Sequence, residues 1–345
     1  MPNILAYLPR QTYRGDISCL EVPFLHTRSL IPAVCALLGV AVAGCGSPAA
    51  KPTAKPGSVS VAYAGSLDYM NDQVLGPAFA KATGIAYSGR GGGSWALAHE
   101  IQGGVIQADV FESLGTGPIA ALAPRQASWA IGFATSPLVV AYNPKSRFAA
   151  QFKAIAQGTK PIRDLFMLLA TPGLRLGRTN PATDPQGQTF YLMVELAQRI
   201  YHLPAGTAQR ILGPWDDPQE VFSEEGLPTQ LQAGGLDASS AFLPQARQLK
   251  LSYVVLPSQL DFANPADLPL YSSVSMAIPE VGTVHGQLSM LALTVLRGKN
   301  EAAGDAFARF VLNKAQDRLW QSQGYELIPP VVWGQKSGIP KGLQR

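Results

Sequence analysis

Apolar positions in this chain fall into short strand-like runs that alternate with segments of helical periodicity. Residues 59–63 form a strand-like run, and residues 70–82 carry apolar side chains at helical spacing. A second short strand is expected at 85–88, a second helix from residue 94, and a third strand at 108–111. Strands and helices in this order predict a parallel α/β sheet with right-handed crossovers.

The same pattern begins again after residue 137, which predicts a second lobe. Residues 138–141 are a continuous apolar run, as expected for a buried strand, and a strand at 174–177 precedes a helix at 188–201. A chain of 345 residues is also longer than one compact core usually accommodates. We predict the following division of the chain: a signal segment at 1–44, a tether at 45–57, lobe 1 at 58–137, lobe 2 at 138–273, and lobe 1 again with a C-terminal helix at 274–345.

The first 57 residues carry the pattern of an exported lipoprotein. Arg28 precedes an apolar run over 30–42 that is too short for a comfortable membrane span, so a secretory signal is expected. Residues 42–45 (Val, Ala, Gly, Cys) resemble the bacterial lipobox, which implies that Cys45 is lipidated and anchors the mature chain to the bacterial cell membrane. The alternatives are an ordinary signal peptide or an uncleaved anchor. Because residues 1–24 fit none of these patterns, we expect the true start further downstream.

Composition and charge narrow the classes of function. With 47% hydrophobic and 14% charged residues the chain is globular, and a net charge of +4 without a basic stripe argues against nucleic-acid binding. Of the three cysteines, Cys19 and Cys35 would leave with the signal, and Cys45 would carry lipid. The mature domain then has no thiol for a disulfide, a zinc site or a nucleophile, and no cofactor is expected.

Two glycine–serine turns follow the first two predicted strands. Gly65 and Ser66 come after the first strand, and Ser94 comes after the glycines at 91–93. At such turns the backbone amides, the serine hydroxyl and the helix dipole favour an anion, and neighbouring strand ends would bring both turns together. The alternative for each serine is a helix N-cap. Neither turn has the Gly-Lys-Ser/Thr of a P-loop or the GxGxxG of a dinucleotide site.

A polar loop in the second lobe, residues 177–187, is the second candidate segment. Its prolines fix the backbone and Gly187 opens a helix, so polar groups such as Asp184 can be held facing the first lobe. The alternative for Asp184 is a helix cap or turn residue. Arg178 is either a ligand clamp or a surface ion pair.

Enzyme chemistry finds little support in the remaining residues. The mature part has His99, His202 and His285, which lack metal-ligand spacing, and no serine stands in a GxSxG turn. The adjacent Glu224 and Glu225 are consistent with a solvated acidic turn.

Together these residues resemble the solute-binding proteins of bacterial ABC transporters, and within them the tungstate/molybdate-binding group. The resemblance extends over about residues 59–325 and rests on four segments: 64–67, 108–110, 180–187 and 232–237. It implies a two-lobed α/β periplasmic-binding-protein fold, type II-like, in which each lobe is a mainly parallel sheet flanked by helices and the ligand lies in the interlobe cleft. It also implies an extracytoplasmic monomer without enzymatic activity, which binds a tetrahedral oxyanion and delivers it to an ABC permease.

The resemblance assigns roles to individual residues of both lobes. Gly65, Ser66 and Ser94 match donors to the oxyanion from the first lobe. Asp184 matches a carboxylate of the second lobe that approaches the metal atom of the oxyanion in some members.

The chain departs from this group in the second lobe. Gly226 stands where a second glutamate ligand is usual, so either Glu225 takes its place or the anion stays four-coordinate. Gln186 stands where a cysteine is frequent, and with Gly187 it is included in the predicted binding site. Residues 238–240 replace a segment that commonly carries a tyrosine.

The candidate anions differ in their chemistry. Molybdate, tungstate and sulfate are fully deprotonated near neutral pH and need donors only, whereas phosphate often keeps a proton and needs an acceptor. A carboxylate such as Asp184 repels a dianion unless it ligates the metal or is protonated. We therefore predict molybdate or tungstate, with phosphate or another oxyanion as the alternative and sulfate disfavoured. A secreted enzyme on this scaffold and a structural surface lipoprotein are the remaining interpretations.

Overall fold

The computed structural model describes residues 57–279, 281–298 and 300–343. Our predictions for the signal segment, for lipidation of Cys45 and for the tether before residue 57 concern residues outside these ranges. Within the described ranges, no helix combines the length and the apolar character needed to cross a membrane.

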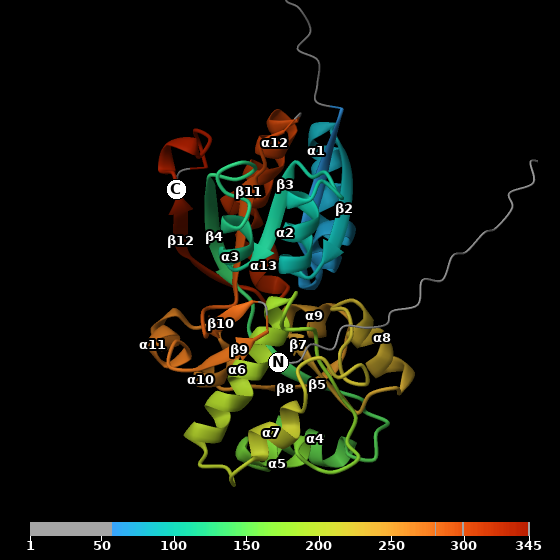
Figure 1. Ribbon diagram of the computed structural model, residues 1–345. Coiled ribbons are helices and arrows are strands. Elements are labelled where there is room, and N and C mark those ends of the chain that lie inside the picture. The colour runs from blue at the N-terminus through green and yellow to red at the C-terminus, as the bar shows by residue number, and fades with distance from the viewer. Residues whose placement is uncertain (1–56, 280, 299, 344–345) are drawn as a thin grey trace, which may run out of the picture. The chain divides into compact units, whose positions relative to one another are not determined.

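The first lobe is built on a six-stranded sheet with the strand order β12-β4-β11-β3-β1-β2 (Figure 1). The strands are β1 (Ser58–Ala64), β2 (Ala86–Gly92), β3 (Val110–Leu114), β4 (Trp129–Thr135), β11 (Met290–Val295) and β12 (Glu326–Gly334). The helical segments are η1 (Gly65–Leu67), η2 (Tyr69–Leu75), α1 (Gly76–Thr83), α2 (Ser94–Gln102), α3 (Gly117–Ala120), α12 (Glu301–Val311), η4 (Lys314–Gln316), α13 (Asp317–Ser322) and η5 (Lys336–Gly338).

The second lobe is built on a four-stranded sheet with the order β6-β7-β5-β8 and a two-stranded sheet of β9 and β10. The strands are β5 (Leu138–Tyr142), β6 (Leu176–Gly177), β7 (Ala238–Phe242), β8 (Ser252–Val255), β9 (Ser275–Ile278) and β10 (Gly282–His285). The helices are α4 (Ala149–Ala156), α5 (Arg163–Leu169), α6 (Pro185–Ile200), α7 (Thr207–Leu212), α8 (Gly226–Ala233), α9 (Leu243–Gln248), α10 (Ser258–Asp261), η3 (Pro265–Asp267) and α11 (Leu268–Tyr271).

Strand β1 is buried on both faces, and its side chains show how the six-stranded sheet is covered. Val61 and Tyr63 belong to the same apolar cluster as residues of α1 and α12, whereas Ala62 belongs to a cluster with residues of α2 and α3. Successive side chains of a strand point to opposite faces, so a strand between two helical layers is apolar at every position. This is why the part of the run at 61–63 lacks polar alternation.

The two-lobed α/β architecture agrees with the sequence prediction, but the strand pairing is mixed rather than mainly parallel. β1 pairs in parallel with β2 and β3, and β6 with β7, whereas β11, β12, β5 and β8 pair antiparallel with their neighbours. β4 ends at Thr135, and β5 begins at Leu138 in the other sheet. A strand that arrives directly from the other lobe needs no helical crossover on its own sheet, so it can run antiparallel to its neighbours.

The chain re-enters the six-stranded sheet at β11, from residue 290, whereas we had placed its return to the first lobe at 274. The hairpin of β9 and β10 precedes this point, and β9 packs against α6 of the second lobe.

Strand β2 extends through the glycine run that we had assigned to a turn. Gly91 pairs with Tyr63, and a Cβ on Gly91 would lie 3.0 Å from the Tyr63 ring. Glycine therefore lets β2 continue beside this aromatic side chain. The turn itself is shortened to Gly93, which directly precedes α2.

Candidate functional site

The end of β1 brings the backbone of the first lobe against two glutamates of the second. A Cβ on Gly65 would lie 2.5 Å from Glu225 Oε1 and 2.9 Å from Glu224 Oε2, distances that only glycine permits. The next residue, Ser66, is 2% exposed, and its backbone amide and hydroxyl interact with the Glu224 carboxyl. The predicted first-lobe donor therefore lies beside carboxyl groups of the second lobe.

Ser94 opens α2 and is buried at the same junction. Its Oγ accepts a hydrogen bond from Leu114 N at 3.1 Å, and Gly93 rather than Ser94 is the N-cap residue. The next two amides, of Trp95 and Ala96, donate to the carbonyl of Thr183 at 3.1 and 3.2 Å. Neither Ser66 nor Ser94 caps a helix through its side chain. The start of α2 is thus joined to the second-lobe loop.

Asp184 is 5% exposed and lies across from the start of α2. A Cβ on Gly93 would lie 3.2 Å from Asp184 Cβ. Its Oδ1 accepts a hydrogen bond from Gln186 N at 2.9 Å, so the expected cap of α6 is present. Burial raises the pKa of Asp184 to about 7, the Gln186 amide opposes this rise, and the negative charge of Glu225 adds to it. Asp184 therefore caps α6 and also lies at the junction between the two lobes.

Glu224 is a buried site residue that the sequence prediction missed. It is 3% exposed, which contradicts the solvated acidic turn that we expected. Its Oε1 accepts a hydrogen bond from Gln186 Nε2 at 2.7 Å, and Gln186 Oε1 accepts one from Ser240 Oγ at 2.8 Å. Burial raises the pKa of Glu224 well above its usual range, and the charges of Asp184 and Glu225 raise it further.

The other predicted second-lobe residues have different surroundings. Glu225 is partly buried, and its Oε1 has no hydrogen-bond partner. Gly187 packs on the loop, because a Cβ there would lie 2.4 Å from the carbonyl oxygen of Thr179. Arg178 is neither a clamp nor a surface residue: it is fully buried, pairs with Glu220, and donates to Tyr191 Oη at 3.0 Å.

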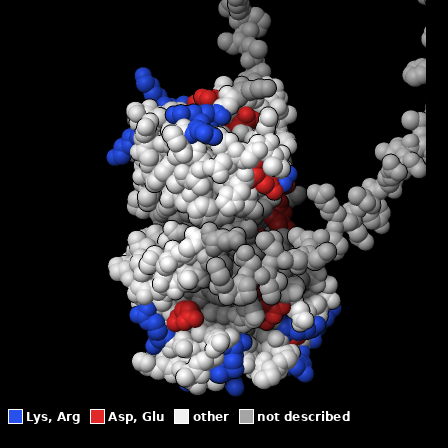
Figure 2. Space-filling view, viewed as in Figure 1, with Lys and Arg blue, Asp and Glu red and all other residues white. Residues whose placement is uncertain are grey.

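A cavity of about 160 Å³ adjoins this cluster between η1 of the first lobe and α8 and α9 of the second. Its lining residues carry carboxyl, amide and hydroxyl groups but no Lys or Arg: Gly65, Ser66, Asp68, Tyr69, Glu225, Pro228, Thr229, Gln232, Gln245, Gln248 and Leu249. On the face drawn in Figure 2, most Lys and Arg side chains likewise lie toward the outer ends of the two lobes. In the described part of the chain, no three His, Cys, Asp or Glu side chains are grouped to hold a metal ion.

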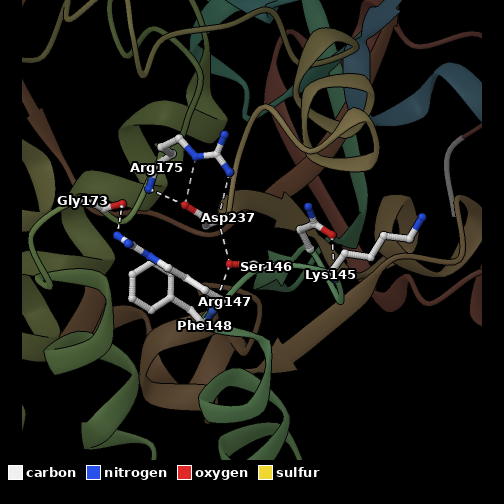
Figure 3. A network of polar contacts seen from close by, with 8 residues as sticks. Lys145, Ser146, Arg147, Phe148, Gly173, Arg175 and Asp237 are labelled. Atoms are coloured by element: carbon white, nitrogen blue, oxygen red, sulfur yellow. Dashed lines mark hydrogen bonds and ion pairs between the residues drawn. The ribbon is translucent and has the colours of Figure 1, made fainter.

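A second polar cluster lies in the outer part of the second lobe (Figure 3). Asp237 accepts hydrogen bonds from Arg175 Nη2 at 3.0 Å and from Ser146 Oγ at 2.7 Å. Burial alone would raise the pKa of Asp237, but the hydrogen bonds from Arg175 outweigh it and lower the pKa. Asp237, the last residue of the segment 232–237 on which the family resemblance partly rests, therefore fixes the loop before β7 to the loop before β6.

Comparison with known proteins places the chain in a family. Residues 59–326 match the model of the bacterial extracellular solute-binding proteins, and the chain belongs to this family. It is accordingly a solute-binding protein and not an enzyme.

Several relatives carry names that refer to molybdenum or tungsten. A Haloferax volcanii protein named for molybdenum binding in an ABC transporter is 29% identical over 197 residues, which cover 57% of this chain and 60% of that relative. The molybdate/tungstate-binding protein WtpA of Pyrococcus abyssi is 23% identical over 243 residues, 64% of this chain and 69% of WtpA. A further relative, whose name refers to no particular solute, is a solute-binding protein of Halobacterium salinarum. It is 28% identical over 312 residues, 89% of this chain and 96% of that relative.

Solved structures share the fold. The periplasmic molybdate-binding protein of Azotobacter vinelandii matches with a TM-score of 0.52 and 19% identity, over 79% of this chain and 100% of that one. The sulfate-binding protein SubI of Mycobacterium tuberculosis matches with a TM-score of 0.51 and 16% identity, over 79% and 87% of the two chains. These similarities confirm the predicted two-lobed periplasmic-binding-protein fold.

Proposed function

We propose that this protein binds a tetrahedral oxyanion, molybdate or tungstate, between its lobes and delivers it to an ABC permease. The observation that carries the proposal is the buried hydroxyl of Ser66, which lines the cavity between the lobes beside the carboxyls of Glu224 and Glu225. A hydroxyl can rotate to suit its partner, so a buried hydroxyl at this junction can donate to a bound anion. The names of the relatives support the same ligand class.

The carboxyls favour molybdate and tungstate over sulfate. Asp184 and Glu224 are linked through Gln186, and Glu225 lies next to them. An ionised carboxylate repels a dianion at this range, unless it coordinates a metal atom or takes up a proton. Molybdenum and tungsten can accept a carboxylate oxygen, whereas sulfur in sulfate cannot.

Phosphate is the second candidate, because one observation also favours it. The pKa values of Asp184 and Glu224 are raised, so these carboxyls can share protons with a bound anion. Together with Gln186, which is hydrogen-bonded to Glu224, they offer a protonated phosphate the acceptor that it needs. Sulfate has no proton to donate to these acceptors.

The remaining elements of the proposal concern location and partners. We propose that Cys45 carries the lipid anchor, that the chain after it is a tether, and that the protein acts as a monomer at the outer face of the membrane. The family assignment supports an extracytoplasmic role. The name of the Haloferax volcanii relative supports an ABC transport partner.

A calorimetric titration of the purified protein with molybdate, tungstate, sulfate and phosphate tests the ligand. We expect saturable binding of molybdate or tungstate, weaker binding of phosphate and none of sulfate. Tight phosphate binding without a response to molybdate or tungstate would replace the first candidate with the second. Binding of none of the four anions would refute an oxyanion function.

A further inference from the structure

The 160 Å³ cavity beside Ser66 is lined by oxygen-bearing groups from both lobes. The first lobe contributes Asp68 and Ser66, and the second contributes Glu225, Gln245 and Thr229. Asp68 Oδ1 accepts a hydrogen bond from the Tyr63 hydroxyl at 3.1 Å. The cavity is therefore rich in acceptors.

Two acceptor oxygens of cavity-lining residues lack a hydrogen-bond partner. They are Glu225 Oε1 and Gln245 Oε1, and both atoms are buried. Gln245 as a whole is 6% exposed, so solvent does not replace the missing partner of its amide oxygen. Buried polar groups are normally satisfied, and two unsatisfied acceptors in one cavity mark a place where a ligand supplies the missing interactions.

The charge at the cavity is negative on every side that carries charge. Asp68 and Glu225 line it, and no Lys or Arg contributes to the lining. A dianion bound next to Ser66 would add to this negative charge. An electropositive partner at the cavity would offset both.

We propose that this cavity binds a hard cation of the calcium type together with the oxyanion. The proposal rests on the proposed function for the anion. The ligands are carboxylate oxygens of Asp68 and Glu225, the amide oxygen of Gln245 and the hydroxyl of Ser66. Ca²⁺ prefers such oxygen ligands, tolerates irregular geometry and completes its six to eight positions with water, for which a cavity of about 160 Å³ leaves room.

Two carboxylates make a weaker site than a dedicated calcium-binding loop. We therefore expect binding of Ca²⁺ alone in the millimolar range of extracellular modules. The bound oxyanion strengthens the site, and by linkage the cation tightens binding of the anion by the same factor. The cation then binds when the two lobes hold the anion, and it is carried together with the anion.

The test is calorimetric titration of the full mature protein with molybdate, once with about 1 mM CaCl₂ and once with EDTA and choline chloride at matched ionic strength. We expect molybdate to bind at least about tenfold more tightly with Ca²⁺. Equal affinity in the two buffers would overturn the cation proposal and leave the oxyanion function intact. Absence of molybdate binding in both buffers would overturn the proposed function itself and the cation site with it.

Two substitutions make the test specific, one from each lobe. Asp68→Asn and Glu225→Gln should each abolish the enhancement by Ca²⁺. In EDTA, Asp68→Asn, which lies outside the proposed oxyanion ligands, should bind molybdate at least as tightly as the unaltered protein, because a repelling charge has been removed. Asp216→Asn, an exposed residue outside the site, is the matched control and should keep the full enhancement. Retention of the enhancement in both Asp68→Asn and Glu225→Gln, with unchanged thermal unfolding, would show that the cation acts elsewhere and overturn the site.

Discussion

The side-chain amide of Gln186 donates a hydrogen bond to Glu224 Oε1 at 2.7 Å, and Ser240 fixes the other end of that amide. Gln186 lies in the first turn of α6, and Glu224 lies two residues before α8. One glutamine therefore sets the position of a buried carboxyl that faces Ser66 of the other lobe. The same residue donates through its backbone to Asp184, so both buried carboxyls depend on it.

We predict that Gln186→Ala destabilises the protein by about 1 to 3 kcal/mol, because it leaves Glu224 and Ser240 without their buried partner. Urea unfolding at neutral pH measures this change. Gln151→Ala, at an exposed position of α4, is the control and should stay within about 0.5 kcal/mol of the unaltered protein. Equal unfolding midpoints for the two variants would mean that the Gln186 bridge contributes nothing to stability.

Ser66→Ala should weaken molybdate binding by about 1 to 3 kcal/mol, the cost of losing a hydrogen-bond donor to a charged group. This corresponds to roughly a 5- to 150-fold rise in Kd, which calorimetry resolves. Ser60→Ala makes the same substitution at the other end of β1, where the hydroxyl donates to the Gln107 carbonyl instead. An unchanged Kd in Ser66→Ala would remove this hydroxyl from the site.

The affinity for molybdate should depend on pH through Asp184 and Glu224. The pKa of Asp184 is about 7, that of Glu224 is also raised, and a bound dianion raises both further. Binding is therefore accompanied by proton uptake, and Kd should fall as the pH is lowered from about 8 to 6. Titrations in EDTA, in two buffers of different ionisation enthalpy, count the protons. Weaker binding at the lower pH would show instead that an ionised carboxylate coordinates the metal.

We predict a separate effect of pH on the free energy of unfolding, which comes from Glu112 on β3. It is buried beside Asn71, which donates to its Oε2 at 2.6 Å, and burial raises its pKa from 4.5 to about 7. The native state then holds a proton that the unfolded state releases above pH 4.5, so unfolding free energy falls as the pH rises from 4.5 to about 7 and levels off above. The loss amounts to about 3 kcal/mol.

Denaturation series at several pH values test this prediction with Glu112→Gln, which keeps the shape without the charge. The variant should gain stability above pH 7 and lack this part of the pH dependence. Glu195→Gln, on the partly exposed middle of α6, serves as control and should reproduce the slope of the unaltered protein. An unaltered slope in Glu112→Gln would assign the pH dependence to other groups.

Local pattern accounts for the parts of the fold and site that the sequence predicted. The strand-like run at 59–63, the glycine at its end and the capping position of Asp184 each depend on neighbours a few residues away. Backbone geometry at that range is set by side-chain size and by hydrogen bonds within a turn. The two-lobed architecture follows from the repetition of the same pattern, and the family match confirms it.

The sequence alone misplaced features that depend on contacts between distant segments. Antiparallel pairing of β11 and β5 follows from strands that cross between the lobes, which periodicity does not record. The glycine run belongs to β2 because glycine leaves room for the ring of Tyr63 on the neighbouring strand. Arg178 can be buried because Glu220 pairs with it. Neither partner is a sequence neighbour.

The sequence by itself thus determined a strand that ends in Gly65 and Ser66, and a capped helix that begins after Asp184. Only the tertiary structure decided what surrounds them. Glu224 is buried because Gln186, 38 residues away, satisfies its carboxyl, and because Gly65 of the other lobe leaves space for it. How deeply a charged group is buried depends on all the residues that pack around it, and these residues come together only in the folded chain.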